Sequence, residues 1–152
     1  MKHRFVHTDR VQFADTDMAG IMHFANFFRF MERAEHAFFR SLGLSVIDRP
    51  EHAAEGGRVG WPRVNVSCDY FAPLYFDDEV EVEVLIEEIR TRAIRFLFRI
   101  RKNAGEIAAE GRMTTVCVQR DEASGKMRAV EIPGRIREKI NAAPEESLAR
   151  PT

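Results

Sequence analysis

The sequence has 152 residues, with little cysteine, no excess of charge of either sign and no long hydrophobic run. Its two cysteines, Cys68 and Cys117, lie in alternating apolar stretches without CxxC spacing, so we interpret them as core residues and not as metal or redox groups. Twenty-three basic residues against 24 acidic ones leave a formal charge of -1. Because no strongly basic field exists, we expect no nucleic acid partner.

The uncharged apolar stretches fall short of the roughly 18 residues that a membrane span needs, so we expect no transmembrane segment. The opening residues, MKHRFVHTDR, lack the apolar run of a secretory signal, and we expect a cytoplasmic protein. The sequence has no GxxxxGK[ST], GxGxxG, HExxH or GxSxG motif. Its five histidines do not cluster, so we also expect no metal site.

One long amphipathic helix is predicted over residues 26–42, because apolar residues recur there at three- and four-residue spacing. Gly43 follows the last periodic residue and Leu44 follows Gly43, which is typical of a left-handed C-terminal cap with an apolar contact. The apolar positions of the helix are Phe27, Phe30, Met31, Ala34, Phe38 and Leu42.

The remaining chain has the two-residue period of strands. Residues 5–13 predict a strand followed by a turn, and four further stretches alternate between residues 63 and 118 with one polar face, as in an antiparallel sheet. The apolar face of that sheet needs a cover, and the Phe-rich helix is the only large apolar stripe available. We therefore predict an α+β fold in one domain, residues 1–141, with a C-terminal tail, 142–152, that frays.

The hairpin from residue 78 to 102 has a well-determined register, in which paired residue numbers sum to 182. This register places Glu87 opposite Arg95 and Glu83 opposite Arg99 on one face, and Val84 against Phe98 on the other. Exposed ion pairs of this kind contribute less than ~1 kcal/mol each. We expect the charged face to be solvated and not to bind a ligand.

Residues 13–26, FADTDMAGIMHFAN, join the first strand to the helix. Asp15 and Asp17 lie just before the helix N-terminus, whose free N–H groups and positive dipole end favour developing negative charge. A carboxylate beside such a site suits acyl transfer. The alternative is that both residues only shape a turn or cap the helix, and the spacing alone favours it because Asp is common in turns.

The motif Phe13-x-Asp-Thr-Asp17-x-x-Gly20, with an aromatic residue and Asn26 at the helix start, resembles the signature of the 4-hydroxybenzoyl-CoA thioesterase family. The family's Tol-Pal-associated and dihydroxynaphthoyl-CoA branches share it. Residues 66–78 and 116–133 resemble further family segments, so the resemblance covers about residues 5–140. It implies a hotdog fold, in which about five antiparallel strands wrap one central helix, and hydrolysis of an acyl-CoA thioester to the free acid and CoA.

The resemblance also implies roles for individual residues. Asp17 would act as nucleophile or as general base for water, and the backbone N–H of Phe24 would hold the oxyanion. Gly20, His23 and Asn26 belong to the same motif and are candidate substrate-binding residues. This chain has His at 23 and an aromatic residue at 24, where the Tol-Pal-associated branch has Tyr then His, so a specific catalytic role for His23 does not carry over.

The family also implies a homodimer or a dimer of dimers with shared sites, and no cofactor, since CoA is part of the substrate. Two further substrate-binding candidates come from the residues themselves. Glu35 lies inside the apolar arc of the helix, where it either lines the acyl pocket or meets an Arg at a subunit contact. Trp61 either walls the pocket or belongs to the core.

Two other functions stay open at the level of the sequence. A non-catalytic acyl-CoA sensor on the same fold would not need the carboxylate of Asp17. A hotdog dehydratase would use a histidine and a carboxylate on the acyl chain, and His23 is its only support.

Overall fold

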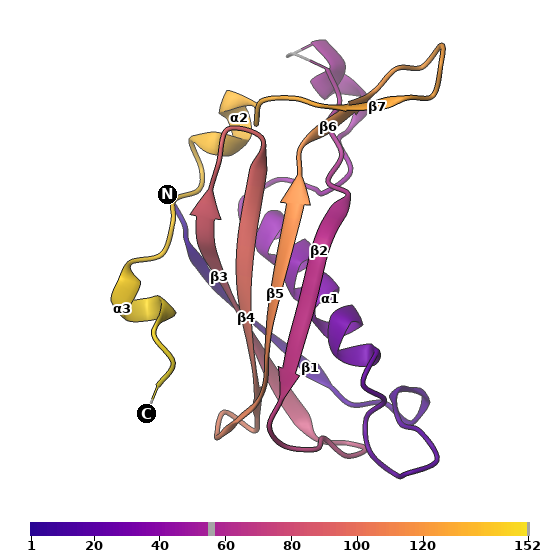
Figure 1. Cartoon of the computed structure of the whole chain (residues 1–152), viewed down its shortest axis with the longest axis vertical. Coiled ribbons are helices and arrows are strands. Elements are labelled where there is room, and N and C mark those ends of the chain that lie inside the picture. Colours follow the sequence, from indigo (N-terminus) through magenta and orange to yellow (C-terminus); the bar gives the residue numbers. More distant parts are fainter. Residues whose placement is uncertain (55–56, 152) are drawn as a thin grey trace.

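The computed structural model describes residues 1–54 and 57–151, so residue 152 of the expected tail lies outside it. One long helix and five long strands dominate the chain (Figure 1). The strands of the main sheet are β1 (Arg4–Arg10), β2 (Arg63–Tyr70), β3 (Glu79–Ile89), β4 (Ala93–Lys102) and β5 (Ile107–Val116). The other elements are η1 (Phe13–Asp15), α1 (Asn26–Ser41), η2 (Pro50–Ala54), β6 (Val118–Arg120), β7 (Met127–Ala129), α2 (Gly134–Arg137) and α3 (Glu145–Leu148).

The main sheet has the order β1-β3-β4-β5-β2, and every neighbouring pair is antiparallel. Helix α1 lies behind the sheet in Figure 1, against its apolar face. The helix connects β1 and β2, which form the two opposite edges of the sheet. This arrangement confirms the α+β prediction of a sheet that wraps one long helix.

The β3–β4 hairpin has the predicted register over most of its length. Pairs from Val80 with Lys102 to Ile86 with Phe96 all sum to 182. A bulge then adds one residue to β3, so Arg95 pairs with Glu88, and the predicted backbone pairing with Glu87 is wrong by one position. The Glu87 carboxylate nevertheless lies 3.2 Å from the Arg95 guanidinium.

The end of α1 has the predicted cap. Gly43 has a φ of +73°, and its N–H donates to the carbonyl of Arg40 at 3.0 Å. The N–H of Leu44 donates to the carbonyl of Phe39 at 3.0 Å. These two bonds are those of a Schellman motif, which satisfies the last carbonyls of the helix.

The core lies between α1 and the sheet. Phe30 and Phe38 from the helix and Phe96 and Phe98 from β4 are among its largest buried side chains. Met31 packs so tightly over β5 that a Cβ on Gly111 would lie 2.2 Å from the Met31 Cε. Gly111 therefore allows the helix to approach the sheet at this position.

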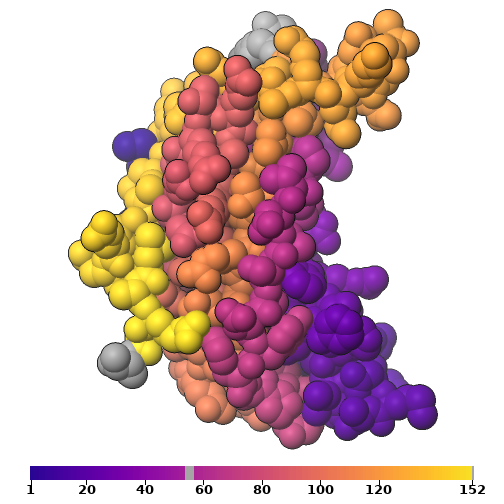
Figure 2. Space-filling view, viewed as in Figure 1, coloured from indigo at the N-terminus to yellow at the C-terminus, as the bar shows by residue number. Residues whose placement is uncertain are grey.

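The outer face of the sheet differs from the expectation of a solvated charged surface. Leu85, Leu97 and Arg99 are all buried there, the last with 3% of its side chain exposed. The residues after Ile140 cover them, with Ala143 and Leu148 packed against the two leucines. The tail that we expected to fray is thus laid along the sheet, as Figure 2 shows for the yellow C-terminal segment.

Candidate functional site

Asp15 shapes the loop between β1 and α1. Its carboxylate accepts a hydrogen bond from the Gln12 N–H at 2.8 Å. Its backbone carbonyl accepts one from the His23 N–H at 2.9 Å and one from the Asn26 side-chain amide at 2.8 Å. Asp15 therefore ties the start of the helix to the end of η1, which is the structural role that its position predicts.

Asp17 lies in a tight turn two residues further on. Its N–H donates to the Ile21 carbonyl and its own carbonyl accepts from the Gly20 N–H, both at 3.0 Å. Gly20 has a φ of +81°, a conformation that favours glycine. One carboxylate oxygen, Oδ1, accepts the Ala19 N–H at 2.9 Å, whereas Oδ2 accepts no hydrogen bond from the part of the chain described. The turn thus holds the carboxylate and leaves one oxygen available.

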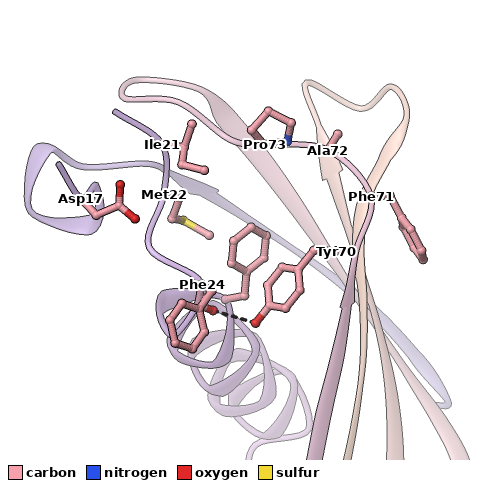
Figure 3. Close-up of a pocket in the computed structure, with 9 residues that line it drawn as sticks. Asp17, Ile21, Met22, Phe24, Tyr70, Phe71, Ala72 and Pro73 are labelled. Carbon is pink, nitrogen blue, oxygen red and sulfur yellow. Dashed lines mark hydrogen bonds between the residues drawn. The ribbon is translucent and has the colours of Figure 1, made fainter. Parts of the chain in front are cut away.

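Among the described residues that line an apolar cavity of about 400 Å³, Asp17 is the only one with a charged side chain. The cavity lies between the Asp loop, the start of α1 and the segment that follows β2 (Figure 3). A cavity of this size and polarity suits an acyl group and the adjoining thioester. Its lining residues are Asp17, Ile21, Met22, Phe24, Phe27, Tyr70, Phe71, Ala72 and Pro73.

The start of the helix meets the end of β2 at Phe24. The Tyr70 hydroxyl donates to the Phe24 carbonyl at 2.9 Å, as the dashed line in Figure 3 marks. Burial, with a smaller effect of the nearby Cys68, raises the pKa of Tyr70 to about 12, so the phenol remains a donor at neutral pH. Within residues 1–54 and 57–151, no group accepts a hydrogen bond from the Phe24 N–H. That N–H can therefore donate a hydrogen bond to a ligand.

The other motif residues support the loop. The side-chain amide of Asn26 donates a hydrogen bond to the Asp15 carbonyl, and the N–H of Gly20 closes the turn at Asp17. The His23 ring accepts the Ala25 N–H at Nδ1, at 3.1 Å, and stacks on the Phe24 ring with centroids 4.6 Å apart. None of the three lines the cavity, so the structure gives them positions beside the site and no direct contact with its interior.

Glu35 and Trp61 lie further along the molecule. Glu35 has 1% of its surface exposed, and its carboxylate accepts a hydrogen bond from the Arg63 guanidinium at 3.1 Å. Of the two roles expected for Glu35, lining the acyl pocket or pairing with an Arg, the structure shows the pairing with an Arg. Its burial, opposed by Arg63 and reinforced by Glu32, raises the pKa to about 7. Trp61 packs on Phe39 with ring centroids 5.9 Å apart, in the core as the alternative reading had it. Neither residue lines the Asp17 cavity.

Cys68 and Cys117 are free, and burial raises the pKa of each thiol to about 11. Over the described ranges, no three His, Cys, Asp or Glu side chains gather into a group that could hold a metal ion. No helix in those ranges has the length and apolar character to cross a membrane.

The segment from Tyr70 to Pro73 is the part of the site to which the sequence assigned no role. It lies in a stretch that resembles the family, yet strand alternation says nothing about which loop a strand end meets. Only the fold brings the Tyr70 hydroxyl to the Phe24 carbonyl, 46 residues away in the chain.

Comparisons with known proteins agree on one family. The sequence model of the Thioesterase-like superfamily matches residues 11–140. A protein of Aquifex aeolicus (strain VF5), provisionally named an esterase, is 32% identical over 88% of this chain and 95% of its own. The acyl-CoA thioester hydrolase YbgC of Escherichia coli O157:H7 is 29% identical over 72% of this chain and 78% of its own.

The 4-hydroxybenzoyl-CoA thioesterase of Pseudomonas sp. (strain CBS-3) is 26% identical over 82% of this chain and 88% of its own. The solved structure of that enzyme superposes with a TM-score of 0.79, at 21% identity, over 91% of this chain and 100% of the other. The structural match establishes the fold, and the sequence matches establish the family.

Proposed function

Since the chain belongs to the thioesterase-like superfamily and is an acyl-CoA thioesterase, we propose that the Asp17 carboxylate carries out its catalysis. The observation that supports this assignment is the shared cavity. Asp17, with one available carboxylate oxygen, and Phe24, whose N–H has no acceptor in the described part of the chain, line the same apolar pocket. A thioester carbonyl between them would have a nucleophile or base on one side and a hydrogen-bond donor on the other.

Two routes are open to Asp17. As nucleophile, the carboxylate attacks the thioester carbon and expels CoA thiolate, and water then hydrolyses the mixed anhydride to release the acid. As general base, it takes a proton from a water molecule that attacks the same carbon, and CoA leaves as the thiolate. Both routes give the free acid and CoA, and neither needs a metal or further cofactor.

Besides the carboxylate, the reaction needs only one donor for the oxyanion. An ordinary aspartate, with a pKa near ~3.9, is ionised at neutral pH. The thiol of CoA, with a pKa near the ~8.5 of a thiol, leaves as thiolate without a general acid. The negative charge that develops on the carbonyl oxygen needs a donor, and the Phe24 N–H at the positive end of α1 supplies one.

We also propose that the working unit is at least a homodimer with acyl-CoA as its ligand. Strand β2 forms an unpaired edge of the sheet, with Val64 and Val66 exposed on it. Phe13, Phe24 and Phe76 are exposed. Phe24 lines the cavity, and the rings of Phe13 and Phe76 contact each other edge-on. An unpaired strand edge exposes backbone N–H and C=O groups, and exposed aromatic side chains favour association with another surface. A second subunit bound at this edge would cover both.

Asp17→Asn tests the proposal, with Asp15→Asn as a matched control. The first change removes the nucleophile or base and keeps the size of the side chain, so turnover of an acyl-CoA substrate should fall ~10² to ~10⁴-fold or more. The second keeps an oxygen that accepts the Gln12 N–H, so the loss should be smaller. Release of free thiol measures both rates, with melting curves as the control on folding.

The result that would contradict the proposal is near wild-type turnover by Asp17→Asn. The carboxylate would then be structural, and an acyl-CoA binding role without catalysis at this site would describe the geometry better. A panel of short, long and aromatic acyl-CoAs in the same assay would identify the acyl group.

A further inference from the structure

The C-terminal segment 143–151, which we call the strap, follows the residues that the family model matches, 11–140. It begins beside the start of β1, with the Ala143 N–H donating to the Ile86 carbonyl at 2.8 Å. It then crosses the outer face towards β2, where the yellow and magenta surfaces meet in Figure 2. The strap therefore reaches Phe71, a residue that borders the site.

A buried guanidinium anchors the strap. Arg99 donates to the backbone carbonyls of Ser147 at 2.8 Å, Leu148 at 2.8 Å and Ala149 at 3.0 Å. Its charge is balanced by Glu110 at 3.4 Å, which is also buried. Removal of the strap would leave several N–H groups of Arg99 without protein partners, so the anchored conformation is strongly favoured.

Arg150 extends this anchor to the site. One of its guanidinium nitrogens donates to Glu110 at 3.2 Å, and the guanidinium lies 4.7 Å from the centre of the Phe71 ring. Glu110 thus links Arg99 and Arg150, which holds the second guanidinium over the ring. A cation over an aromatic face at this distance is an attractive contact.

Phe71 stands between the strap and the cavity. It follows the last residue of β2, and its N–H donates to the Ala108 carbonyl at 2.8 Å. Phe71 borders the Asp17 cavity while its ring points away from Asp17 (Figure 3), towards a second cavity of about 380 Å³ bordered by Arg101 and Arg150. The backbone of Phe71 therefore separates its ring, on the side of the strap, from the Asp17 cavity.

We infer that Arg150 is a positioning residue for thioester hydrolysis, acting through Phe71 and Tyr70 on the backbone of Phe24. Tyr70 precedes Phe71 and donates to the Phe24 carbonyl, and the N–H of Phe24 is the proposed oxyanion donor. A fixed Phe71 ring restrains the Tyr70 hydroxyl and hence the orientation of that N–H. This inference rests on the proposed function.

The position of an oxyanion donor affects the transition state more than the bound substrate, so the effect falls on kcat and leaves KM nearly unchanged. Arg150→Gln removes the charge and the ring contact from an exposed side chain. We expect kcat to fall about 3- to 10-fold, since small displacements of a positioned group carry rate losses of this order or more. Arg150→Lys keeps a cation near the ring and should restore part of kcat.

The matched control is Arg95→Gln, because Arg95 is also a partly exposed, ion-paired arginine on the outer face of the sheet but does not contact Phe71. Phe71→Leu completes a double-mutant cycle. If Arg150 acts through the ring, adding Arg150→Gln to Phe71→Leu lowers kcat no further. Melting temperatures of all variants serve as the control on folding.

The inference is overturned if Arg150→Gln leaves kcat unchanged, if Arg95→Gln lowers it equally, or if the Arg150→Gln loss persists in full in the Phe71→Leu background. These outcomes are separate from the test of the proposed function. Retained activity in Asp17→Asn refutes the role of Asp17 whatever the Arg150 variants do. Lost activity in Asp17→Asn without Arg150–Phe71 coupling refutes the positioning role alone.

Discussion

Glu35 is a carboxyl group buried in the helix that carries the site, and its ionisation affects the stability of the fold. Its pKa is raised from 4.5 to about 7, chiefly by burial, and Arg63 opposes the shift. The native state therefore binds a proton that the unfolded state has already released between pH 4.5 and 7. The stability gained from protonated Glu35 is present at low pH and is lost as the pH rises through about 7.

This linkage predicts that the wild-type protein loses up to about 3 kcal/mol of unfolding free energy from Glu35 between pH 4.5 and pH 8. Glu35→Gln cannot ionise and should show a flatter dependence over the same range. Urea unfolding at pH 5, 6, 7 and 8, at one fixed protein concentration, measures the difference between the two proteins. Parallel pH curves would show that Glu35 does not titrate as its burial implies.

The two aspartates of the loop show how far single residues can be assigned from sequence. The prediction that Asp15 shapes the turn is confirmed, because its carboxylate and carbonyl accept three hydrogen bonds from the loop and the helix start. The motif placed the acting carboxylate at Asp17, and the structure puts Asp17 on the cavity wall. Its catalytic role stays a prediction until the variants are measured.

At the scale of secondary structure elements, the contact between α1 and β5 depends on one residue without a side chain. A Cβ at Gly111 would lie 2.2 Å from the Met31 Cε, 2.6 Å from its Sδ and 3.1 Å from the Ser67 carbonyl oxygen. Met31 is fully buried, so its methyl group cannot move freely out of the way.

Gly111→Ala should therefore destabilise the protein by about 1 to 3 kcal/mol through overpacking between the helix and the sheet. Adding Met31→Val to Gly111→Ala makes space for the new methyl group, so the double variant should lose less than the two single changes added together. Chemical denaturation of the four proteins provides the measurement. Full additivity would mean that the two residues do not contact each other in solution.

The β3–β4 hairpin was predictable because two independent patterns agreed. Opposite charges face each other on one side of the register that sums to 182, and apolar side chains face each other on the other side. The bulge at Glu87 was not predictable, since Glu87 and Glu88 are both acidic and either can stand opposite Arg95. The sequence alone gives no preference between them.

The strap was missed for a physical reason. Its contribution to burial comes from only two apolar side chains, Ala143 and Leu148, so it has no periodic pattern. What holds it is the Arg99 guanidinium bonding to backbone carbonyls, and carbonyls are present at every residue. An alternating strand pattern marks Arg99 as facing outward but does not indicate whether another segment covers it.

At the scale of the whole molecule, the exposed edge of β2 and the aromatic side chains near the site predict assembly into at least a dimer. Light scattering at micromolar concentration should give a mass of at least twice the 17.5 kDa of the chain. A fully active species of 17.5 kDa would contradict a shared site. Activity should be measured on the same fraction, so that mass and turnover refer to one species.

The strand order has a consequence for the synthesis of the chain. Helix α1 ends at Ser41, but the strands that cover its phenylalanines are complete only when β5 ends at Val116, about 75 residues later. At translation rates of ~5 to 20 residues per second, roughly 4 to 15 seconds pass between the synthesis of α1 and the synthesis of the last strand that covers it. During that interval the nascent chain exposes an aromatic surface, so the yield of soluble protein should depend on chaperones and on growth temperature.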